Sequence, residues 1–235
     1  MSSILISQEH SLSLQQEQAL YIEAVIASHR AITRPVIHNY HGQPLTILPN
    51  VYSPFIGPSG CVSLAFASQV IFENKRVLDI GCGSGVVACL ATLSGAKRAV
   101  GTDINPEAIK NSRLNAEQNR ISDRTGFWLG SLFEPLEDTS EEFDIVFANL
   151  PFTAGKPKDM LEAAFYDDSL NSIRRYLKEL PRWITENDAK GYLCLSDMDG
   201  DYLPELAQQS KLNWREYFRI NLHWVTLFII ELTRS

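Results

Sequence analysis

Length, composition and charge narrow the class of protein. At 235 residues, 45% of them hydrophobic, the chain is long enough to bury the core of one α/β domain. A net charge of −7 and a pI of about 5.3 indicate no basic face, which disfavours a nucleic-acid partner. Cysteines 61, 82, 89 and 194 lack any paired or metal-ligating spacing, so we expect buried thiols in a reducing compartment and no metal. Without an apolar run of roughly 20 residues or a signal-peptide pattern at the start, we expect a cytoplasmic protein and no membrane partner.

The first 60 residues have a pattern of their own. Apolar residues recur at helical spacing from 12 to 29, which predicts a leading helix. Two apolar runs, 36–40 and 45–48, flank a turn that contains Gly42 and Pro44, and this pattern predicts a β-hairpin. We therefore predict a substrate cap over 1–60, followed by a catalytic domain over 61–235.

Strands and helices alternate from residue 75 onward with short turns between them. This alternation is typical of a parallel sheet that is covered by helices on both faces. The ending differs, because the β-rich runs 214–219 and 224–232 have no helix between them and predict an antiparallel hairpin. The fold class is therefore α/β, with a seven-stranded Rossmann-like sheet, a C-terminal hairpin and an N-terminal extension. We expect helices at 61–72, 84–94, 106–118, 169–185 and 201–210, and parallel strands at 76–79, 98–102, 125–128, 143–147 and 191–195.

A glycine-rich turn follows the first parallel strand. Residues 79–85 read Asp-Ile-Gly-Cys-Gly-Ser-Gly, and such a turn before a helix lets a ligand approach the backbone closely. The third glycine, Gly85, comes one position too early for the GxGxxG spacing of dinucleotide-binding folds, which disfavours NAD. Asp79 lies just ahead of the turn, where a carboxylate suits a cationic group better than a pyrophosphate. These features predict a ligand with a positive charge near Asp79.

The second parallel strand ends in Asp103. An acid at this position of a nucleotide-binding sheet accepts hydrogen bonds from a ribose diol, and the alternative is that Asp103 caps the helix that begins near Pro106. We favour the ribose role because the glycine turn lies upstream. Asn105, at the start of the same helix, is included in the predicted cofactor site.

Residues 77–85 resemble the first motif of the class I S-adenosylmethionine-dependent methyltransferases, and the resemblance extends over about 75–235. It implies S-adenosylmethionine as the cofactor, bound at its methionine end by Asp79 and the loop residues. It also implies a ribose contact from Asp103, adenine packing on Ile104, and adenine contacts in 130–133. The cofactor residues that follow are Asp79, Gly81, Cys82, Gly83, Gly85, Asp103, Ile104, Asn105, Ser131, Leu132 and Asn149.

The fourth parallel strand ends in the tetrapeptide Asn149-Leu150-Pro151-Phe152, at the sheet edge where ligands bind in open α/β folds. The Asn149 side-chain carbonyl can accept hydrogen bonds from an amino group, and Pro151 stiffens the loop. Phe152 can stack on a planar substrate or contact a sulfonium methyl. We expect Asn149, Pro151 and Phe152 to act in catalysis, and we add Tyr166 as a residue that shapes the acceptor pocket.

The tetrapeptide resembles the Asn-Pro-Pro-aromatic motif of glutamine and adenine amino-methyltransferases, except that position 150 is Leu. The resemblance implies methyl transfer to an amine or amide nitrogen of a small-molecule or protein acceptor. Two alternatives stay open. One is non-methyl alkyl chemistry on the sulfonium, such as cyclisation that releases methylthioadenosine, and the other is a non-catalytic scaffold subunit.

Overall fold

The computed structural model describes residues 13–184, 188–197, 203–222 and 225–235. Within these residues no helix is both long and apolar enough to cross a bilayer. Short 3₁₀ turns lie at Glu134–Leu136, Glu162–Ala164, Asp168–Leu170 and Leu180–Arg182. The helices are α1 (Leu14–Arg30), α2 (Pro58–Gln69), α3 (Val86–Leu93), α4 (Pro106–Gln118), α5 (Asn171–Glu179) and α6 (Leu203–Gln209). The strands are β1 (Val36–Tyr40), β2 (Gln43–Ile47), β3 (Arg76–Ile80), β4 (Arg98–Asp103), β5 (Thr125–Leu129), β6 (Ile145–Ala148), β7 (Thr153–Ala154), β8 (Tyr166–Asp167), β9 (Lys190–Ser196), β10 (Leu212–Asn221) and β11 (Thr226–Arg234).

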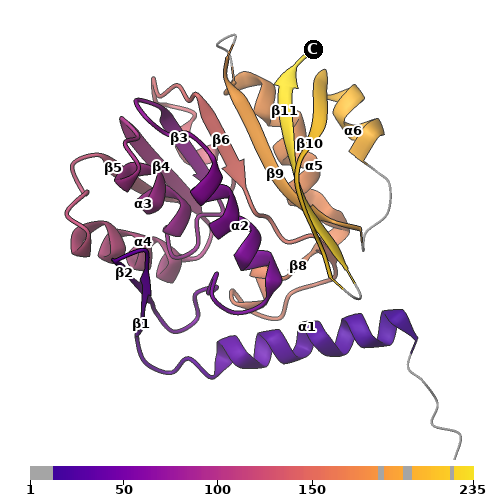
Figure 1. The fold of residues 1–235 in the computed structure, drawn as a ribbon. Coiled ribbons are helices and arrows are strands. Elements are labelled where there is room, and N and C mark those ends of the chain that lie inside the picture. Colours follow the sequence, from indigo (N-terminus) through magenta and orange to yellow (C-terminus); the bar gives the residue numbers. More distant parts are fainter. Residues whose placement is uncertain (1–12, 185–187, 198–202, 223–224) are drawn as a thin grey trace, which may run out of the picture.

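A seven-stranded sheet with the order β10-β11-β9-β6-β3-β4-β5 forms the centre of the fold. The strands from β9 to β5 pair in parallel, whereas β11 pairs antiparallel with both β9 and β10. Figure 1 shows this hairpin, coloured orange to yellow, at one edge of the sheet. The predicted fold class is confirmed, including the N-terminal helix and the two-stranded β1-β2 hairpin.

The sheet is buried on both faces, because successive residues of a strand point to opposite sides. On β3, Val77 packs into a cluster with residues of α2 and α3, whereas Leu78 and Ile80 pack into a second cluster with α5 and α6. This arrangement explains why the parallel strands are almost uniformly apolar in sequence. Only the strand ends and the loops beyond them are free to carry polar chemistry.

Three sequence-based expectations need correction. The helix expected at 61–72 begins at Pro58 and ends at Gln69, so its first turn includes residues that we expected in the preceding loop. The helix expected at 169–185 is shorter, because Ser169 and Leu170 have positive φ angles of 59° and 54° and delay the start of α5. Cys61 is exposed rather than buried, while the other three cysteines are buried.

Two buried asparagines of α4 join the N-terminal hairpin to the central fold. Asn115 accepts a hydrogen bond from the Thr46 amide at 2.7 Å and donates to the carbonyls of Thr46 and Ser84, both at 2.9 Å. Asn111 accepts from the Leu48 amide at 2.8 Å and donates to the Thr46 carbonyl at 2.7 Å. The outer edge of β2 is therefore paired by side chains instead of by another strand.

We predict that Asn115→Ala lowers the free energy of unfolding by about 2 kcal/mol, because it leaves buried polar groups of Thr46 and Ser84 without this partner. Chemical denaturation measures the change. Asn119→Ala is the control, since the half-buried Asn119 also binds the hairpin, at the Pro44 carbonyl, but through an exposed hydrogen bond. Equal losses in the two variants would contradict this assignment.

Candidate active site

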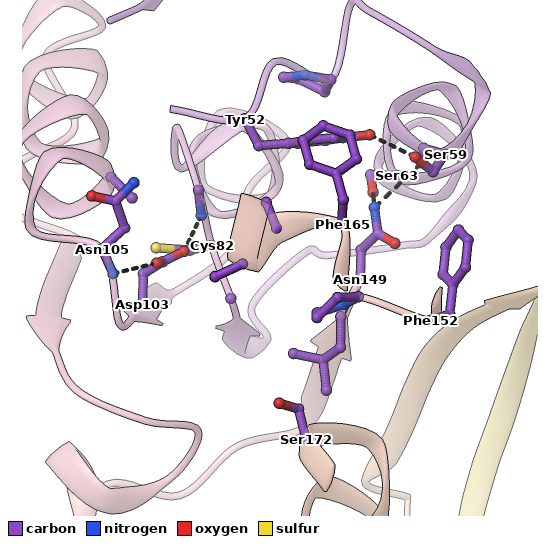
Figure 2. Close-up of a pocket in the computed structure, with 18 of the residues that line it drawn as sticks. Tyr52, Ser59, Ser63, Cys82, Asp103, Asn105, Asn149, Phe152, Phe165 and Ser172 are labelled. Atoms are coloured by element: carbon purple, nitrogen blue, oxygen red, sulfur yellow. Dashed lines mark hydrogen bonds between the residues drawn. The ribbon is translucent and has the colours of Figure 1, made fainter. Parts of the chain in front are cut away.

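One pocket lies at the carboxyl ends of β3, β4 and β6, and it continues beneath α1. Figure 2 shows its side chains converging from the loops that follow these strands and from the segments before and within α2. Most of the predicted site residues line it. They are Asp79, Gly81, Cys82, Gly83, Asp103, Ile104, Asn105, Ser131, Leu132, Asn149, Pro151 and Phe152.

The glycine loop has the backbone conformation that its sequence predicts. Gly83 has a φ of +53°, and its amide donates to Oδ2 of Asp103 at 2.8 Å. A Cβ atom on Gly83 would meet only the Tyr52 carbonyl, at 4.0 Å, so the space beside this residue is open. Burial raises the pKa of the Cys82 thiol well above its usual value, so this thiol is not a nucleophile at neutral pH. The loop forms an open cradle next to the end of β3.

Asp79 is almost fully buried, with 3% of its surface exposed, and its Oδ2 atom has no hydrogen-bond partner. Its pKa is raised to about 8, mainly by burial and also by the negative charge of Asp103, while a backbone hydrogen bond from Ala88 opposes the shift. An unpartnered buried carboxyl oxygen beside an open cradle fits a ligand that supplies a cationic N–H group. This is what the ammonium group of the cofactor's methionine end supplies.

Asp103 connects the glycine loop to α4. Its Oδ1 accepts from the Asn105 amide at 2.8 Å, in addition to the bond from Gly83. Asn105, not Asp103, caps α4, because the Asn105 side chain accepts from the Glu107 amide. This removes the alternative role of Asp103 as the helix cap, and its ribose contact stays a prediction. Burial raises the pKa of Asp103, and the amides of Asn105, Gly83 and Ile104 oppose that shift.

The side chain of Asn149 has a fixed orientation. Its Nδ2 donates to Oγ of Ser63 at 2.9 Å and to the Ser59 carbonyl at 3.3 Å, both in the first turns of α2 (Figure 2). Both amide hydrogens are therefore engaged by α2, which leaves Oδ1 as the atom that can accept a hydrogen bond from a ligand. Leu150, the residue that departs from the motif, is buried and packs into the core beneath the loop.

Two predicted site residues do not line the pocket. Gly85 has a structural role: its φ is +74°, and a Cβ there would lie 2.4 Å from Cβ of Ser112 on α4. Tyr166 belongs to β8, which pairs with β7 just beyond the Asn149 motif, and its ring lies against Gly155. Its predicted part in shaping the acceptor pocket stays a prediction.

The wall of the pocket opposite the sheet is built from residues that the sequence did not single out as site residues. Tyr21, Ile22 and Val25 of α1 line it, together with Met160 and Phe165 from the segment between β7 and β8. The helical stripe of α1 was visible in the sequence, but a stripe alone does not show which surface it covers. Nothing in the sequence marked Phe165.

Three rings from separate segments meet at this wall. The ring of His29, at the end of α1, stacks on Tyr52 with centroids 5.0 Å apart, and Phe165 contacts both rings edge-on, at 5.1 Å and 5.5 Å. Burial lowers the pKa of His29, so this ring is neutral near pH 7. The Tyr52 hydroxyl is hydrogen-bonded to Oγ of Ser59 at 2.6 Å, which ties the ring cluster to the same turn of α2 that orients Asn149.

Charge is distributed unevenly along the pocket. Among the lining residues that the structure describes, Asp79 and Asp103 alone carry carboxyl groups, and none is a lysine, arginine or histidine. Both acids lie at the glycine-loop end, whereas the end near Asn149 is lined by aromatic, aliphatic and uncharged polar groups. The arrangement suits a cationic ligand at one end and an uncharged group at the other.

Similarities to known proteins fall on the same part of the chain. Residues 58–153 match the ribosomal protein L11 methyltransferase family. The ribosomal protein L11 methyltransferase of Pasteurella multocida is 40% identical over 105 residues, which is 44% of this chain and 33% of the relative. The Escherichia coli (strain 55989 / EAEC) protein of the same name is 40% identical over 95 residues, 40% of this chain and 30% of the relative. The matched region thus spans about a third of each relative.

Solved structures show the same fold. A ribosomal protein L11 methylase from Lactobacillus delbrueckii subsp. bulgaricus superimposes with a TM-score of 0.55 at 18% identity, covering 81% of this chain and 94% of that one. A T. Thermophilus 16S rRNA methyltransferase in complex with AdoMet and guanosine gives 0.58 at 19% identity, covering 84% and 50%.

The fold is that of the class I S-adenosylmethionine-dependent methyltransferases, and residues 58–153 match one of their families, so the predicted resemblance is confirmed. Because the match spans about a third of each relative, methyl transfer and the cofactor are proposals for this chain. The family model matches residues 58–153, which include the cofactor loops and Asn149 but not α1 or Phe165.

The titration of Asp79 yields a prediction about stability. In the unfolded chain its pKa is near 3.8, whereas in the fold it is about 8, so between these values the native state holds a proton that the unfolded state has lost. The free energy of unfolding should therefore fall as pH rises from 5 to 8, by at least about 1 kcal/mol relative to Asp79→Asn. Urea unfolding of both proteins at several pH values measures this, with Asp123→Asn as an exposed control. A wild-type curve parallel to that of Asp79→Asn would contradict it.

Proposed function

We propose that the chain is an S-adenosylmethionine-dependent N-methyltransferase whose acceptor is an uncharged amine or amide nitrogen. The observation that carries the proposal is the orientation of Asn149, whose Nδ2 is engaged by Ser63 and Ser59 so that Oδ1 is available to an N–H donor. The same pocket contains the glycine loop and Asp79. A methyl donor and a nitrogen acceptor therefore have adjacent places.

The cofactor end is assigned to residues that already have suitable geometry. We assign the methionine ammonium to Asp79 and the glycine loop, because Oδ2 of Asp79 lacks a partner. Asp103 is assigned to the ribose. Ile104 is assigned to the adenine, because it lines the pocket and is 47% exposed there, so it offers an apolar surface to a ligand. Ser131 and Leu132, on the loop after β5, complete this end.

The reaction needs positioning more than acid or base chemistry. When bound, S-adenosylmethionine supplies an electrophilic methyl group on a positively charged sulfur. Oδ1 of Asn149 accepts a hydrogen bond from the acceptor nitrogen and so directs its lone pair, and well-oriented reactants alone can lower a barrier by about 7 kcal/mol or more. Phe152, Tyr52 and Phe165 exclude water from this end of the pocket. The described residues near Asn149 carry no charged side chain, which favours an acceptor that is neutral at pH 7 over an ammonium group.

The kind of molecule that carries the nitrogen is a further part of the proposal. The relatives' name supports a protein acceptor, but the matched residues 58–153 hold mainly the cofactor loops. The wall formed by α1 and Phe165 lies outside that region, so the acceptor of this chain need not be ribosomal protein L11. A protein or small-molecule acceptor, a cytoplasmic location and a substrate cap within residues 1–60 stay predictions.

The deciding experiment is incubation with S-adenosylmethionine, alone and with panels of amides, aryl amines and proteins, followed by mass spectrometry. We expect S-adenosylhomocysteine only when an acceptor is present. Methylthioadenosine formed without an acceptor would instead establish chemistry on another sulfonium carbon. Binding of S-adenosylhomocysteine without turnover on any panel would favour a scaffold.

We predict that variants of the two ends of the pocket separate binding from transfer. Asp103→Ala should weaken S-adenosylhomocysteine binding by about tenfold or more, because it removes the ribose acceptor and the bonds to Gly83 and Asn105. Asn149→Ala should retain binding within about threefold and lose roughly a hundredfold in transfer. Calorimetry measures the first effect and methyl incorporation the second, with the exposed Asn213→Ala as control. Equal loss of cofactor binding in both variants would contradict the assignment of Asp103 to the cofactor and Asn149 to the acceptor.

A further inference from the structure

The segment between β7 and β8 is attached to α1 by an ion-pair cluster. Nη2 of Arg30, the last residue of α1, lies 2.8 Å from Oδ2 of Asp159 and 2.9 Å from Oε1 of Glu162. Arg30 and Glu162 are 132 positions apart in the sequence. The contact joins the N-terminal helix to the loop that directly follows the Asn149 motif.

The carboxylate of Glu162 needs a nearby cation, because its side chain is only 7% exposed to solvent. Its other polar contacts are the Lys158 amide, 2.9 Å from Oε2, and the Lys158 ammonium, 3.9 Å away on a side chain that is 85% exposed. The guanidinium of Arg30 is therefore the closest cation to a buried carboxylate. Removing one partner of such a pair leaves a charge that the fold must re-expose to water.

Re-exposing Glu162 would move the wall of the pocket. Glu162 begins the 3₁₀ turn Glu162–Ala164, and the next residue is Phe165, whose ring lines the pocket and contacts Tyr52 and His29. Ala163 and Ala164 of that turn line the pocket as well. The position of Phe165 over the end near Asn149 therefore depends on how Glu162 is held.

We propose that Arg30 is a positioning residue that assembles the acceptor end of the pocket: by holding Asp159 and Glu162, it fixes residues 158–165 and places Phe165 over the site. The inference rests on the proposed function, because it takes the Asn149 end as the acceptor end. Through Arg30, α1 then positions the acceptor end of the pocket as well as covering it. Both α1 and residues 158–165 lie outside the residues 58–153 that the family model matches, so this wall is a part of the pocket in which this chain can differ from that family.

The test compares Arg30→Ala and Arg30→Lys with Arg98→Ala by hydrogen exchange and by stopped-flow release of S-adenosylhomocysteine. Arg98 is the matched control, because its Nε lies 2.8 Å from Glu141 in another partly exposed pair, and it does not line the pocket. We expect Arg30→Ala to lower amide protection of residues 158–165 by about tenfold or more. Ligand release should become about fivefold faster, because Phe165 no longer closes the pocket.

Arg30→Lys, which keeps the positive charge, should recover at least half of the lost protection on a logarithmic scale, whereas Arg98→Ala should change neither measurement. A double-mutant cycle with Glu162→Gln should show strong non-additivity in the release rate, which a general loss of stability does not produce. Unchanged protection and unchanged release in Arg30→Ala would overturn the proposal. If the wild-type protein failed to bind S-adenosylhomocysteine, the proposed function would fail, and exchange in the unliganded protein would still decide the role of Arg30.

Discussion

The parallel pairing of β3 with β4 and β6 is the constraint on which the rest of the structure depends. Parallel strands in register end at the same edge of the sheet, so the loops after Ile80, Asp103 and Ala148 must lie side by side. Both faces of the sheet are covered by helices, which leaves this edge as the place where polar groups can meet a ligand. The glycine loop, Asp103 and Asn149 are close together for this reason, although Gly81 and Asn149 are 68 positions apart in the sequence.

The same constraint explains which parts of the molecule could be predicted from the sequence. Residues 77–85 fix a strand, a turn and a helix by local rules, namely an apolar run followed by glycines that adopt positive φ. Asp103 and Asn149 were found because each ends an apolar strand, a position that topology alone brings to the site. The sequence shows that Leu150 departs from the Asn-Pro-Pro-aromatic motif but not why. In the structure the Leu150 side chain is buried in the core beneath the loop.

The parts that could not be predicted depend on contacts between distant segments. Ser63 lies in a helix whose sequence has no polar pattern, and only the fold shows that its hydroxyl receives the Asn149 amide. Asn111 and Asn115 look like ordinary residues of an amphipathic helix, yet they pair the edge of β2. Phe165, which the sequence did not single out, lines the pocket, whereas its neighbour Tyr166 begins the two-residue strand β8. Which of two adjacent aromatic rings faces a pocket depends on the local backbone path, which the sequence does not show.

The division of charge in the pocket follows from the energetics of burial. A buried carboxylate without a partner is costly, and Asp79 avoids that cost in the unliganded fold by keeping its proton, as its raised pKa shows. A cationic ligand would reverse the balance and favour the ionised form, so affinity for the cofactor and the protonation of Asp79 are linked. At the other end the described lining residues carry no charge, so on the proposed function an acceptor is recognised by the direction of Asn149 Oδ1 and by the shape of the ring cluster around it. On the proposed function, electrostatics selects the cofactor and geometry selects the acceptor. The first could therefore be predicted from the sequence, whereas the second needed the structure.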